Sequence, residues 1–383
     1  MTIVTNENDI VIVSALRTPI SKAKRGNLKD LTNDMLVYHA IRGTFEKTNI
    51  DPKLIDEICM GHGLSPMNGS GALRVGSLRA GVPLTVPVST VNRQCASGLD
   101  SLEIIANKIR LGKIEIGLAG GFESMSSYGI DQGKMTLMDD DIQKVKDCFI
   151  QMGVTAEILA HKNSISRQKS DIFAYNSHKR AYEATEKNFF EDEIVPIKIN
   201  DQVVDFDDGI RLTDMEKLGN LRSVFKENGV CSAGNASQLS DGASAILLMK
   251  RRKAEELGLE IKGVFVDFAV VGVNPSVMGE GPVPAIRKLL KNNNLAMKDI
   301  DYFEINEAFA CQAVYCIEEL GIHMDKVNLH GGAIALGHPI GCTGGRLVGS
   351  LLNVMQKNNI KGYGIISLCV GTGQGVAALF KRD

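Results

Sequence analysis

Two cysteines and one histidine lie at glycine-flanked ends of predicted elements, far apart in the chain. The first is Cys95, in residues 92–98 (NRQCASG), where a β-branched run is followed by a helix-period pattern. A thiol at such a corner lies near unpaired backbone N–H groups and the positive end of a helix dipole, which favour the thiolate. Taken alone, the pattern also fits a buried structural cysteine.

The histidine and the second cysteine lie near the other end of the sequence. His338 is in a glycine-rich turn at residues 335–345 (ALGHPIGCTGG) that precedes a helical pattern. Cys369 ends a predicted strand that continues into residues 370–375 (VGTGQG). The alternatives are a turn histidine and a core cysteine. Together the three residues can supply a nucleophile, a base and a second acid/base.

Composition excludes several classes of function. The chain has 383 residues, 44% of them hydrophobic and 23% charged, which is typical of a globular protein of two or three domains. The net charge of −2 and the absence of a basic tract argue against nucleic acid, and no apolar run reaches membrane-spanning length. The eight cysteines lack C-x-x-C spacing, so we expect reduced thiols, no disulfides and no metal site.

No targeting signal is visible at either end. The first residues (MTIVTNE) lack the layout of a secretory signal, and the last three (KRD) are not the Ser-Lys-Leu peroxisomal address. We expect an intracellular protein, in the peroxisome or the cytoplasm.

The elements that must position these residues occur twice. Each half has a buried strand, a helix, a glycine corner with one reactive residue, a helix and a glycine-ended strand; the strands are predicted at residues 10–13 and 114–121, then at 264–268 and 364–370. Alternating strands and helices predict mixed, largely parallel sheets covered by helices. Two such halves facing each other would bring Cys95 and His338 to one central cleft.

A more highly charged segment separates the halves. The alternating pattern fades between residues 127 and 239, which predicts an inserted lobe. We therefore expect an N-terminal half at 1–126 and 240–262, an insertion at 127–239 and a C-terminal half at 263–383. The insertion either binds a ligand or only stabilises the fold. The small polar residues at 232–237 (SAGNAS) favour close approach of a ligand.

With these segments assembled, the chain resembles the thiolases. The matching segments follow the family's order: residues 92–98, 120–126 (GGFESMS), 233–237 (AGNAS), 306–310 (NEAFA), 331–341 and 369–375. The resemblance implies an α/β thiolase fold, with two similar βαβαβαββ halves packed as a layered αβαβα core and an inserted loop domain. Residues 25–26, 147–153, 269–273 and 340–344 resemble the peroxisomal 3-ketoacyl-CoA thiolases in particular.

The family implies an acyltransferase. CoA-dependent cleavage of a 3-ketoacyl-CoA yields acetyl-CoA and a shortened acyl-CoA, as in fatty acid β-oxidation, and the reverse reaction is a Claisen condensation. By resemblance, Cys95 forms the acyl-enzyme, His338 takes its proton and Cys369 moves the proton of the acetyl-CoA carbon. Asn306 would hold a water for the enolate, or cap a helix, and the Gly371 N–H would bind the second oxyanion together with that of Cys95.

The resemblance also implies where CoA binds. It implies that CoA is a substrate, that no cofactor is bound permanently, and that the protein forms a homodimer or a dimer of dimers. Arg211 would stack on adenine, or serve only as a surface salt-bridging arginine. Ser237 would bond the pantetheine arm. Four side chains would line the apolar sleeve, or simply pack in the core: Phe225, Met152, Met278 and Phe309.

Other functions remain open at this point. The main alternative is a biosynthetic acetoacetyl-CoA thiolase, although these usually carry histidine where this chain has Gln151. A non-enzymatic acyl-CoA or lipid carrier is expected to lose a reactive residue, and none is lost. A ketoacyl-ACP synthase and a redox protein fit the Cys369 segment less well. His330 follows a strand-like run and receives no catalytic role.

Overall fold

The structure is a computed structural model that describes residues 6–64, 69–129 and 136–383. The predicted start of the N-terminal half at residue 1 and residues 130–135 of the predicted insertion lie outside this range. The N-terminal half consists of β1 (Ile10–Arg17), β2 (Ser21–Lys22), α1 (Asn33–Thr48), β3 (Glu57–Gly61), α2 (Gly69–Arg79), β4 (Val88–Val91), α3 (Ser97–Arg110), β5 (Ile116–Ser124), β8 (Ser240–Lys250) and α8 (Arg251–Glu256).

The C-terminal half consists of β9 (Gly263–Gly272), α9 (Pro282–Asn292), β10 (Ile300–Ile305), α10 (Ala310–Leu320), α11 (Ala333–Leu336), α12 (Ile340–Lys357), β11 (Gly362–Val370) and β12 (Gln374–Arg382). Between β5 and β8 the chain forms α4 (Gln143–Asp147), α5 (Met152–Lys162), α6 (Arg167–Glu186), β6 (Ile197–Ile199), β7 (Gln202–Val204) and α7 (Met215–Gly219). Short 3₁₀ helices include η2 (Gln94–Ala96) and η3 (Pro275–Glu280).

The two halves share one topology. The strand order is β1-β8-β5-β3-β4 in the first half and β9-β12-β11-β10 in the second, and an antiparallel pairing of β1 with β9 joins them. A parallel bridge between Phe303 and Val327 stands where β4 stands in the first half. The predicted repeat is therefore confirmed.

The prediction that the sheets are largely parallel is wrong. Only β3–β4, β3–β5 and β10–β11 are parallel among the named strand pairs that the structure describes. The last strand of each half runs back beside the first, so β8 and β12 pair antiparallel with both neighbours. No crossover helix precedes β12, because a tight turn after Val370 leads directly into Gln374, and such a turn reverses the chain.

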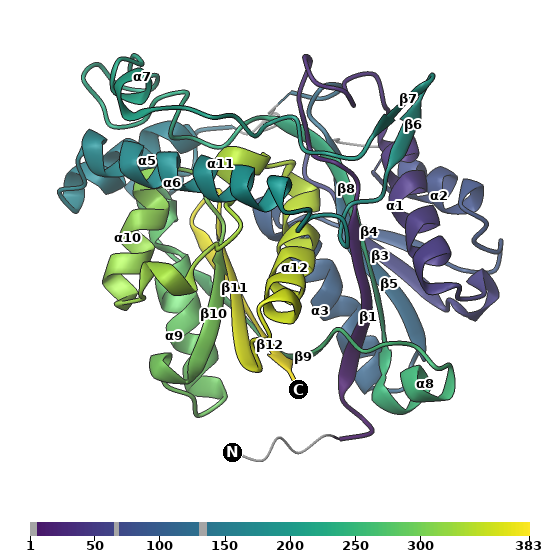
Figure 1. Cartoon of the computed structure of the whole chain (residues 1–383). Helices are drawn as coiled ribbons and strands as arrows, with labels where there is room; N and C mark the ends of the chain where they lie inside the picture. The colour runs from purple at the N-terminus through teal and green to yellow at the C-terminus, as the bar shows by residue number, and fades with distance from the viewer. Residues whose placement is uncertain (1–5, 65–68, 130–135) are drawn as a thin grey trace.

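The helices form three layers around the sheets. Figure 1 shows α1 and α2 outside the N-terminal sheet, α9 and α10 outside the C-terminal sheet, and α3 and α12 between the two. Every residue of α12 from Ile340 to Met355 is buried, as expected for a helix enclosed on all sides. One apolar cluster joins α3, α12 and strands of both halves, so the central layer is the shared core.

Glycines allow the two central helices to meet at their N-termini. A Cβ on Gly344 would lie 2.2 Å from the Leu99 backbone nitrogen, and a Cβ on Gly98 would lie 2.7 Å from the Gly341 carbonyl oxygen. Because Cys95 precedes α3 and His338 precedes α12, this contact sets both reactive residues beside each other.

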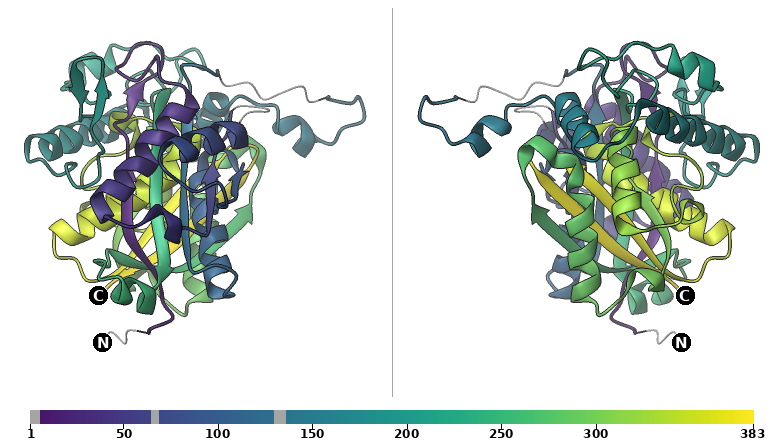
Figure 2. Two further views of the ribbon diagram at one scale, coloured as in Figure 1. Left: turned by 90° about the vertical axis from the view of Figure 1, so that its right-hand side faces the viewer. Right: turned by 90° about the vertical axis from the view of Figure 1, so that its left-hand side faces the viewer.

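The segment between β5 and β8 covers one end of both halves (Figure 1). A buried arginine holds it in place: Arg17, at the end of β1, forms ion pairs with Glu193 at 2.8 Å and with Asp207 at 2.7 Å. Figure 2 shows that the part carrying α4 stands out from the rest of the molecule. We propose that this segment is the inserted unit predicted at 127–239.

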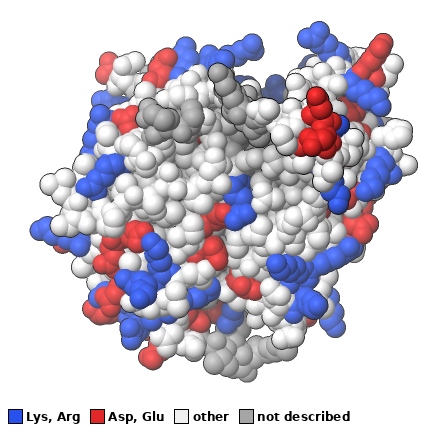
Figure 3. Space-filling view, turned by 180° about the vertical axis from the view of Figure 1, so that it is seen from behind, with Lys and Arg blue, Asp and Glu red and all other residues white. Residues whose placement is uncertain are grey.

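The surface carries charges of both signs, and the cysteines are unpaired. Basic and acidic side chains are interspersed on the face seen in Figure 3. Within the described ranges, no helix is long and apolar enough to cross a membrane. The same residues contain no group of His, Cys, Asp and Glu arranged to hold a metal ion. All eight cysteines lie in the described ranges and are free thiols there.

Candidate active site

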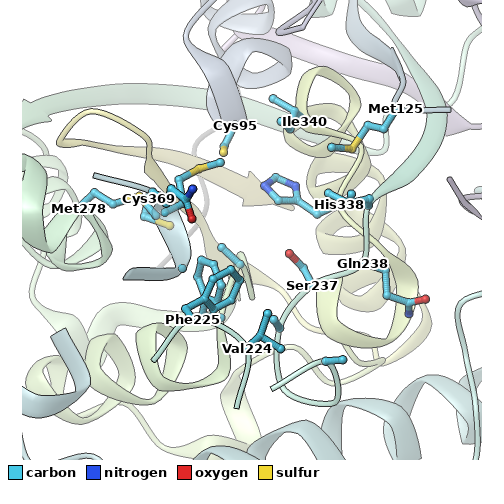
Figure 4. Close-up of a pocket in the computed structure, with 18 of the residues that line it drawn as sticks. Cys95, Met125, Val224, Phe225, Ser237, Gln238, Met278, His338, Ile340 and Cys369 are labelled. Carbon is cyan, nitrogen blue, oxygen red and sulfur yellow. The ribbon is translucent and has the colours of Figure 1, made fainter. Parts of the chain in front are cut away.

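A cavity of about 880 Å³ lies where the two halves meet under the inserted segment, and Cys95, His338 and Cys369 all line it. Figure 4 shows the three side chains directed toward one another around this space. Most of the remaining lining is apolar, including Met125, Val224, Leu239 and Ile340. The structure therefore brings Cys95 together with His338 and Cys369, which lie more than two hundred positions further along the sequence.

A strained turn presents the thiol of Cys95. Cys95 belongs to η2, between β4 and α3, and Gln94 before it adopts a left-handed backbone with φ of 47°. Non-glycine residues adopt this conformation at a cost, and such residues cluster at functional sites. The turn places Cys95 immediately before the N-terminus of α3, as the sequence predicts.

Burial controls the charge of Cys95. It raises the pKa of the thiol to about 11, while the N–H groups of Gly371 and of Cys95 itself act in the opposite direction. The predicted effect of backbone donors is present, but the prediction that the position favours thiolate overall is wrong, because the loss of solvent outweighs them. The resting group is the thiol, and a base must take its proton.

His338 is the candidate for that base, since it lines the same cavity. Burial, and then the positive charge of Arg346, lower the pKa of His338 to about 3, so the ring is neutral at physiological pH. Its Nδ1 lies 2.6 Å from the Thr343 hydroxyl, and its Nε2 lies 3.5 Å from Nδ2 of Asn306. A neutral imidazole in the tautomer with a bare Nε2 can accept a proton from the cavity side.

Asn306 is fully buried directly after β10, and its Oδ1 has no hydrogen-bond partner among the residues that the structure describes. Helix α10 begins at Ala310, with Phe309 as its N-cap residue, so the alternative of a helix cap at Asn306 is wrong. A buried carbonyl oxygen without a partner is costly unless something donates to it. Asn306 therefore retains an acceptor for a water or a substrate group.

Gly371 donates its backbone N–H toward the Cys95 thiol, which lowers the pKa of that thiol. A Cβ at this position would lie 2.0 Å from Oε1 of Gln94, so glycine lets the two loops approach. The N–H groups of Cys95 and Gly371 thus converge on one sulfur. Two backbone donors beside the sulfur could also stabilise an oxyanion that forms next to it.

Cys369 is fully buried at the end of β11 and touches the same cavity. Burial, and then the neighbouring Cys95, raise the pKa of its thiol well above the usual value. A small apolar cluster surrounds it, formed by Met278 and Ala308 with Met152 and Phe309 beside them. The thiol is therefore protonated at rest, and it is also packed among core residues.

The predicted CoA-binding residues divide into two groups. Five of them line the cavity: Met152, Phe225, Ser237, Met278 and Phe309. The rings of Phe225 and Phe309 meet edge to face, with centroids 6.0 Å apart. Arg211 does not line the cavity; it is exposed, and its Nη2 donates to the Ala233 carbonyl at 3.3 Å, at the rim. Within the described part of the chain, Arg211 forms no ion pair.

Sequence reasoning gave no role to Glu123, which the structure places beside the site. This fully buried carboxylate accepts hydrogen bonds from the backbone N–H groups of Gly63, Leu64 and Gly341. It therefore ties the loop that follows His338 to the N-terminal half. The available signal was an ionisable residue two positions after the glycine-ended strand predicted at 114–121.

The exclusion of His330 from catalysis agrees with its position. Its ring stacks on Phe189, with centroids 4.4 Å apart, and it does not line the cavity.

Two family models cover nearly the whole chain. The N-terminal domain of thiolase matches residues 10–252, and the C-terminal domain of thiolase matches residues 259–382. The chain belongs to the thiolase family. The fold of this thiolase agrees with that of the dimeric peroxisomal thiolase of Saccharomyces cerevisiae, with a TM-score of 0.95 and 42% identity over 100% of this chain and 99% of the other.

Two further relatives place this thiolase near the 3-ketoacyl-CoA enzymes. The peroxisomal 3-ketoacyl-CoA thiolase of Encephalitozoon cuniculi is 53% identical, with coverage of 98% of this chain and 96% of the relative. The human mitochondrial 3-ketoacyl-CoA thiolase, solved in complex with CoA, has a TM-score of 0.90 at 34% identity, over 98% of each chain.

Proposed function

We propose that this thiolase cleaves 3-ketoacyl-CoA with CoA, and that the reaction passes through an acyl-enzyme on Cys95. The observation that carries the proposal is the meeting of Cys95, His338 and Cys369 around one apolar cavity. The relatives named as 3-ketoacyl-CoA thiolases support this substrate class. They also favour it over the biosynthetic acetoacetyl-CoA reaction.

The first step forms the covalent intermediate. The proton of the Cys95 thiol moves to Nε2 of His338, and the sulfur attacks the 3-keto carbon of the substrate. Negative charge then develops on the former keto oxygen. The N–H groups of Cys95 and Gly371, which lie beside the sulfur, would bind that oxygen, and losing one such donor costs roughly 10²–10³ in rate.

The second step breaks the bond between carbons 2 and 3. The bonding electrons leave with carbon 2 as the enolate of acetyl-CoA, and the acyl group stays on Cys95. Nε2–H of His338 and a water held by the open Oδ1 of Asn306 would donate to the enolate oxygen. Cys369 gives its thiol proton to carbon 2, which releases acetyl-CoA and leaves a Cys369 thiolate.

The third step returns the enzyme to its starting state. The Cys369 thiolate takes the proton of the incoming CoA thiol, and the CoA sulfur attacks the thioester on Cys95. The shortened acyl-CoA leaves, and Cys95 regains its proton from His338. Each proton taken in the cycle is returned, so the enzyme ends in its initial protonation state.

CoA enters over the inserted segment in this proposal. Arg211 at the rim would stack on adenine, Ser237 would bond pantetheine, and the four apolar side chains would surround the arm. CoA is then a substrate, and no permanently bound cofactor is required. The names of the relatives support a homodimer and a peroxisomal location.

Absorbance of the magnesium enolate of acetoacetyl-CoA tests the proposal. Addition of CoA to the enzyme should make this absorbance decay, and longer 3-ketoacyl-CoA substrates should be cleaved as well. The variant Cys95→Ala should show neither decay nor an acyl-enzyme in the mass spectrum. Wild-type enzyme that leaves all these substrates intact would refute the assignment.

A further inference from the structure

The buried ring nitrogen of His338 is bonded to a hydroxyl that has no part in the steps above. Nδ1 lies 2.6 Å from Oγ1 of Thr343, which is in the first turn of α12. His338 is 8% exposed and Thr343 is 0% exposed, so solvent does not compete for either group. Thr343 does not line the cavity and is not placed to touch the substrate.

The same hydroxyl has a second partner, and this limits where its proton can be. Oγ1 of Thr343 also lies 3.1 Å from the carbonyl oxygen of Pro339. A carbonyl oxygen only accepts, so the hydroxyl proton satisfies this bond. In this arrangement Oγ1 has only lone pairs left for His338, so Nδ1 carries the hydrogen and donates it to Thr343.

The contact of Nε2, on the opposite edge of the ring, is consistent with a hydrogen on Nδ1. With the proton on Nδ1, the nitrogen Nε2 is bare, and it can accept from Nδ2 of Asn306 at 3.5 Å. The opposite tautomer would turn Nε2–H against that amide donor. Both contacts of the imidazole therefore favour one tautomer, which is the one able to take a proton from Cys95.

We infer that Thr343 is a positioning residue that holds His338 in the Nδ1–H tautomer and supports the imidazolium once Nε2 has taken the Cys95 proton. The inference rests on the proposed acyl-transfer chemistry. When the S–H bond breaks, the electron pair stays on sulfur and the proton goes to Nε2. The Nδ1–H bond to Thr343 then becomes charge-assisted, and such bonds are shorter and stronger than neutral ones.

Other charged groups act on the same pair and are unchanged by a substitution at 343. Arg346 of α12 disfavours the imidazolium, while Glu123 of β5 disfavours the Cys95 thiolate. Cys369 of β11 interacts with the same thiolate. An effect of Thr343 would therefore add to a fixed electrostatic background.

The test compares three variants. Thr343→Val keeps the branched shape but removes the hydroxyl, and Thr343→Ser keeps the hydroxyl. Thr44→Val is the matched control, because Thr44 is also fully buried, its hydroxyl bonds the carbonyl four residues earlier at 3.0 Å, and it lies in α1 away from the cavity. Thermal unfolding checks that each variant is folded.

Thr343→Val should lower kcat and the rate of Cys95 alkylation by iodoacetamide about 10- to 100-fold, because a buried hydrogen bond to a charged intermediate is lost. The pH at which alkylation becomes fast should rise, since the imidazolium is less well supported. The KM for CoA should stay unchanged. Thr343→Ser should restore most of the rate, and Thr44→Val should match the wild type.

Two results would overturn the inference. One is a folded Thr343→Val enzyme with the rate and pH profile of the wild type. The other is a ¹⁵N spectrum of histidine-labelled wild type that shows His338 protonated at Nε2, and this measurement needs no variant at 343. A wild-type enzyme without thiolase activity would instead refute the proposed function, so the two failures are distinguishable.

Discussion

Burial disfavours ionisation of every reactive side chain in the cavity. It raises the pKa of the Cys95 thiol to about 11, raises that of the Cys369 thiol well above its usual value, and lowers that of His338 to about 3. The resting site is therefore uncharged at neutral pH. Charge arises only during the reaction, when the donors of Cys95 and Gly371 and the open acceptor of Asn306 have a ligand to bind.

The role of Cys369 can be separated from that of Cys95 by isotope exchange. Cys369→Ala should leave part of the acylation of Cys95 intact but slow the loss of deuterium from methyl-labelled acetyl-CoA by about 10²–10⁴-fold, the usual contribution of a general acid/base. Mass spectrometry of the recovered acetyl-CoA measures this loss. Cys316→Ala removes another fully buried thiol in the same half, outside the cavity lining, and should exchange normally. Normal exchange in Cys369→Ala would remove its acid/base role.

At the scale of elements, the site depends on how closely α3 and α12 approach. Both helices begin beside a reactive residue, and glycines at their N-termini allow backbone to meet backbone. Interiors are packed too densely to absorb even one added carbon at such a contact. The distance between Cys95 and His338 is therefore set by residues that carry no reactive group.

Gly344→Ala tests this dependence. The new Cβ would lie 2.2 Å from the Leu99 backbone nitrogen, so the helices must separate, and overpacking of this kind costs about 1–3 kcal/mol. We expect a lower unfolding midpoint in urea together with a lower kcat. Gly71→Ala is the control, because that glycine lies in α2, is exposed, and a Cβ there has no described atom within 4 Å. Equal stability and activity of the two variants would contradict the argument.

The segment between β5 and β8 carries Arg211, whose proposed contact with CoA can be tested alone. Arg211→Ala should raise the KM for CoA about 3- to 30-fold, the range of a lost cation–π contact, and leave kcat nearly unchanged because adenine lies far from the reacting carbon. Steady-state kinetics at varied CoA concentration measure both constants. Arg42→Ala removes an exposed arginine from α1 and serves as the control. An unchanged KM for CoA would show that Arg211 is a surface residue that does not bind CoA.

The sequence predicts the site better than the details around it. Cys95, His338 and Cys369 were recognisable because each combines a reactive type with glycines at an element end, which is local information. The antiparallel direction of β8 and β12 could not be recognised from the sequence, since residue alternation is the same for either strand direction. The contacts of Glu123 and Thr343 were missed as well, because their partners depend on loop geometry and not on residue type.

Across the whole molecule, the burial of ionisable side chains makes the free energy of unfolding depend on pH. Burial lowers the pKa of His178 and His330 to about 4, and that of His338 to about 3, so the folded chain resists their protonation. Burial also raises the pKa of Glu304 to about 8, which acts in the opposite direction. The net pH dependence of stability is a difference between such groups, and a single group must be isolated by substitution.

His330 is the clearest case, because it lies outside the cavity between Phe189 and Phe190. Its folded-state pKa is lowered, first by burial and then by two lysines, so its contribution is present above about pH 6.5 and is lost as the pH falls toward 4. Wild type should therefore lose about 2 kcal/mol more than His330→Gln between pH 7 and pH 5. Urea unfolding at both pH values measures this difference.

His323→Gln, a change at an exposed histidine, should behave as the wild type. If His330→Gln showed the full wild-type loss, the stacked ring would not be a source of acid sensitivity.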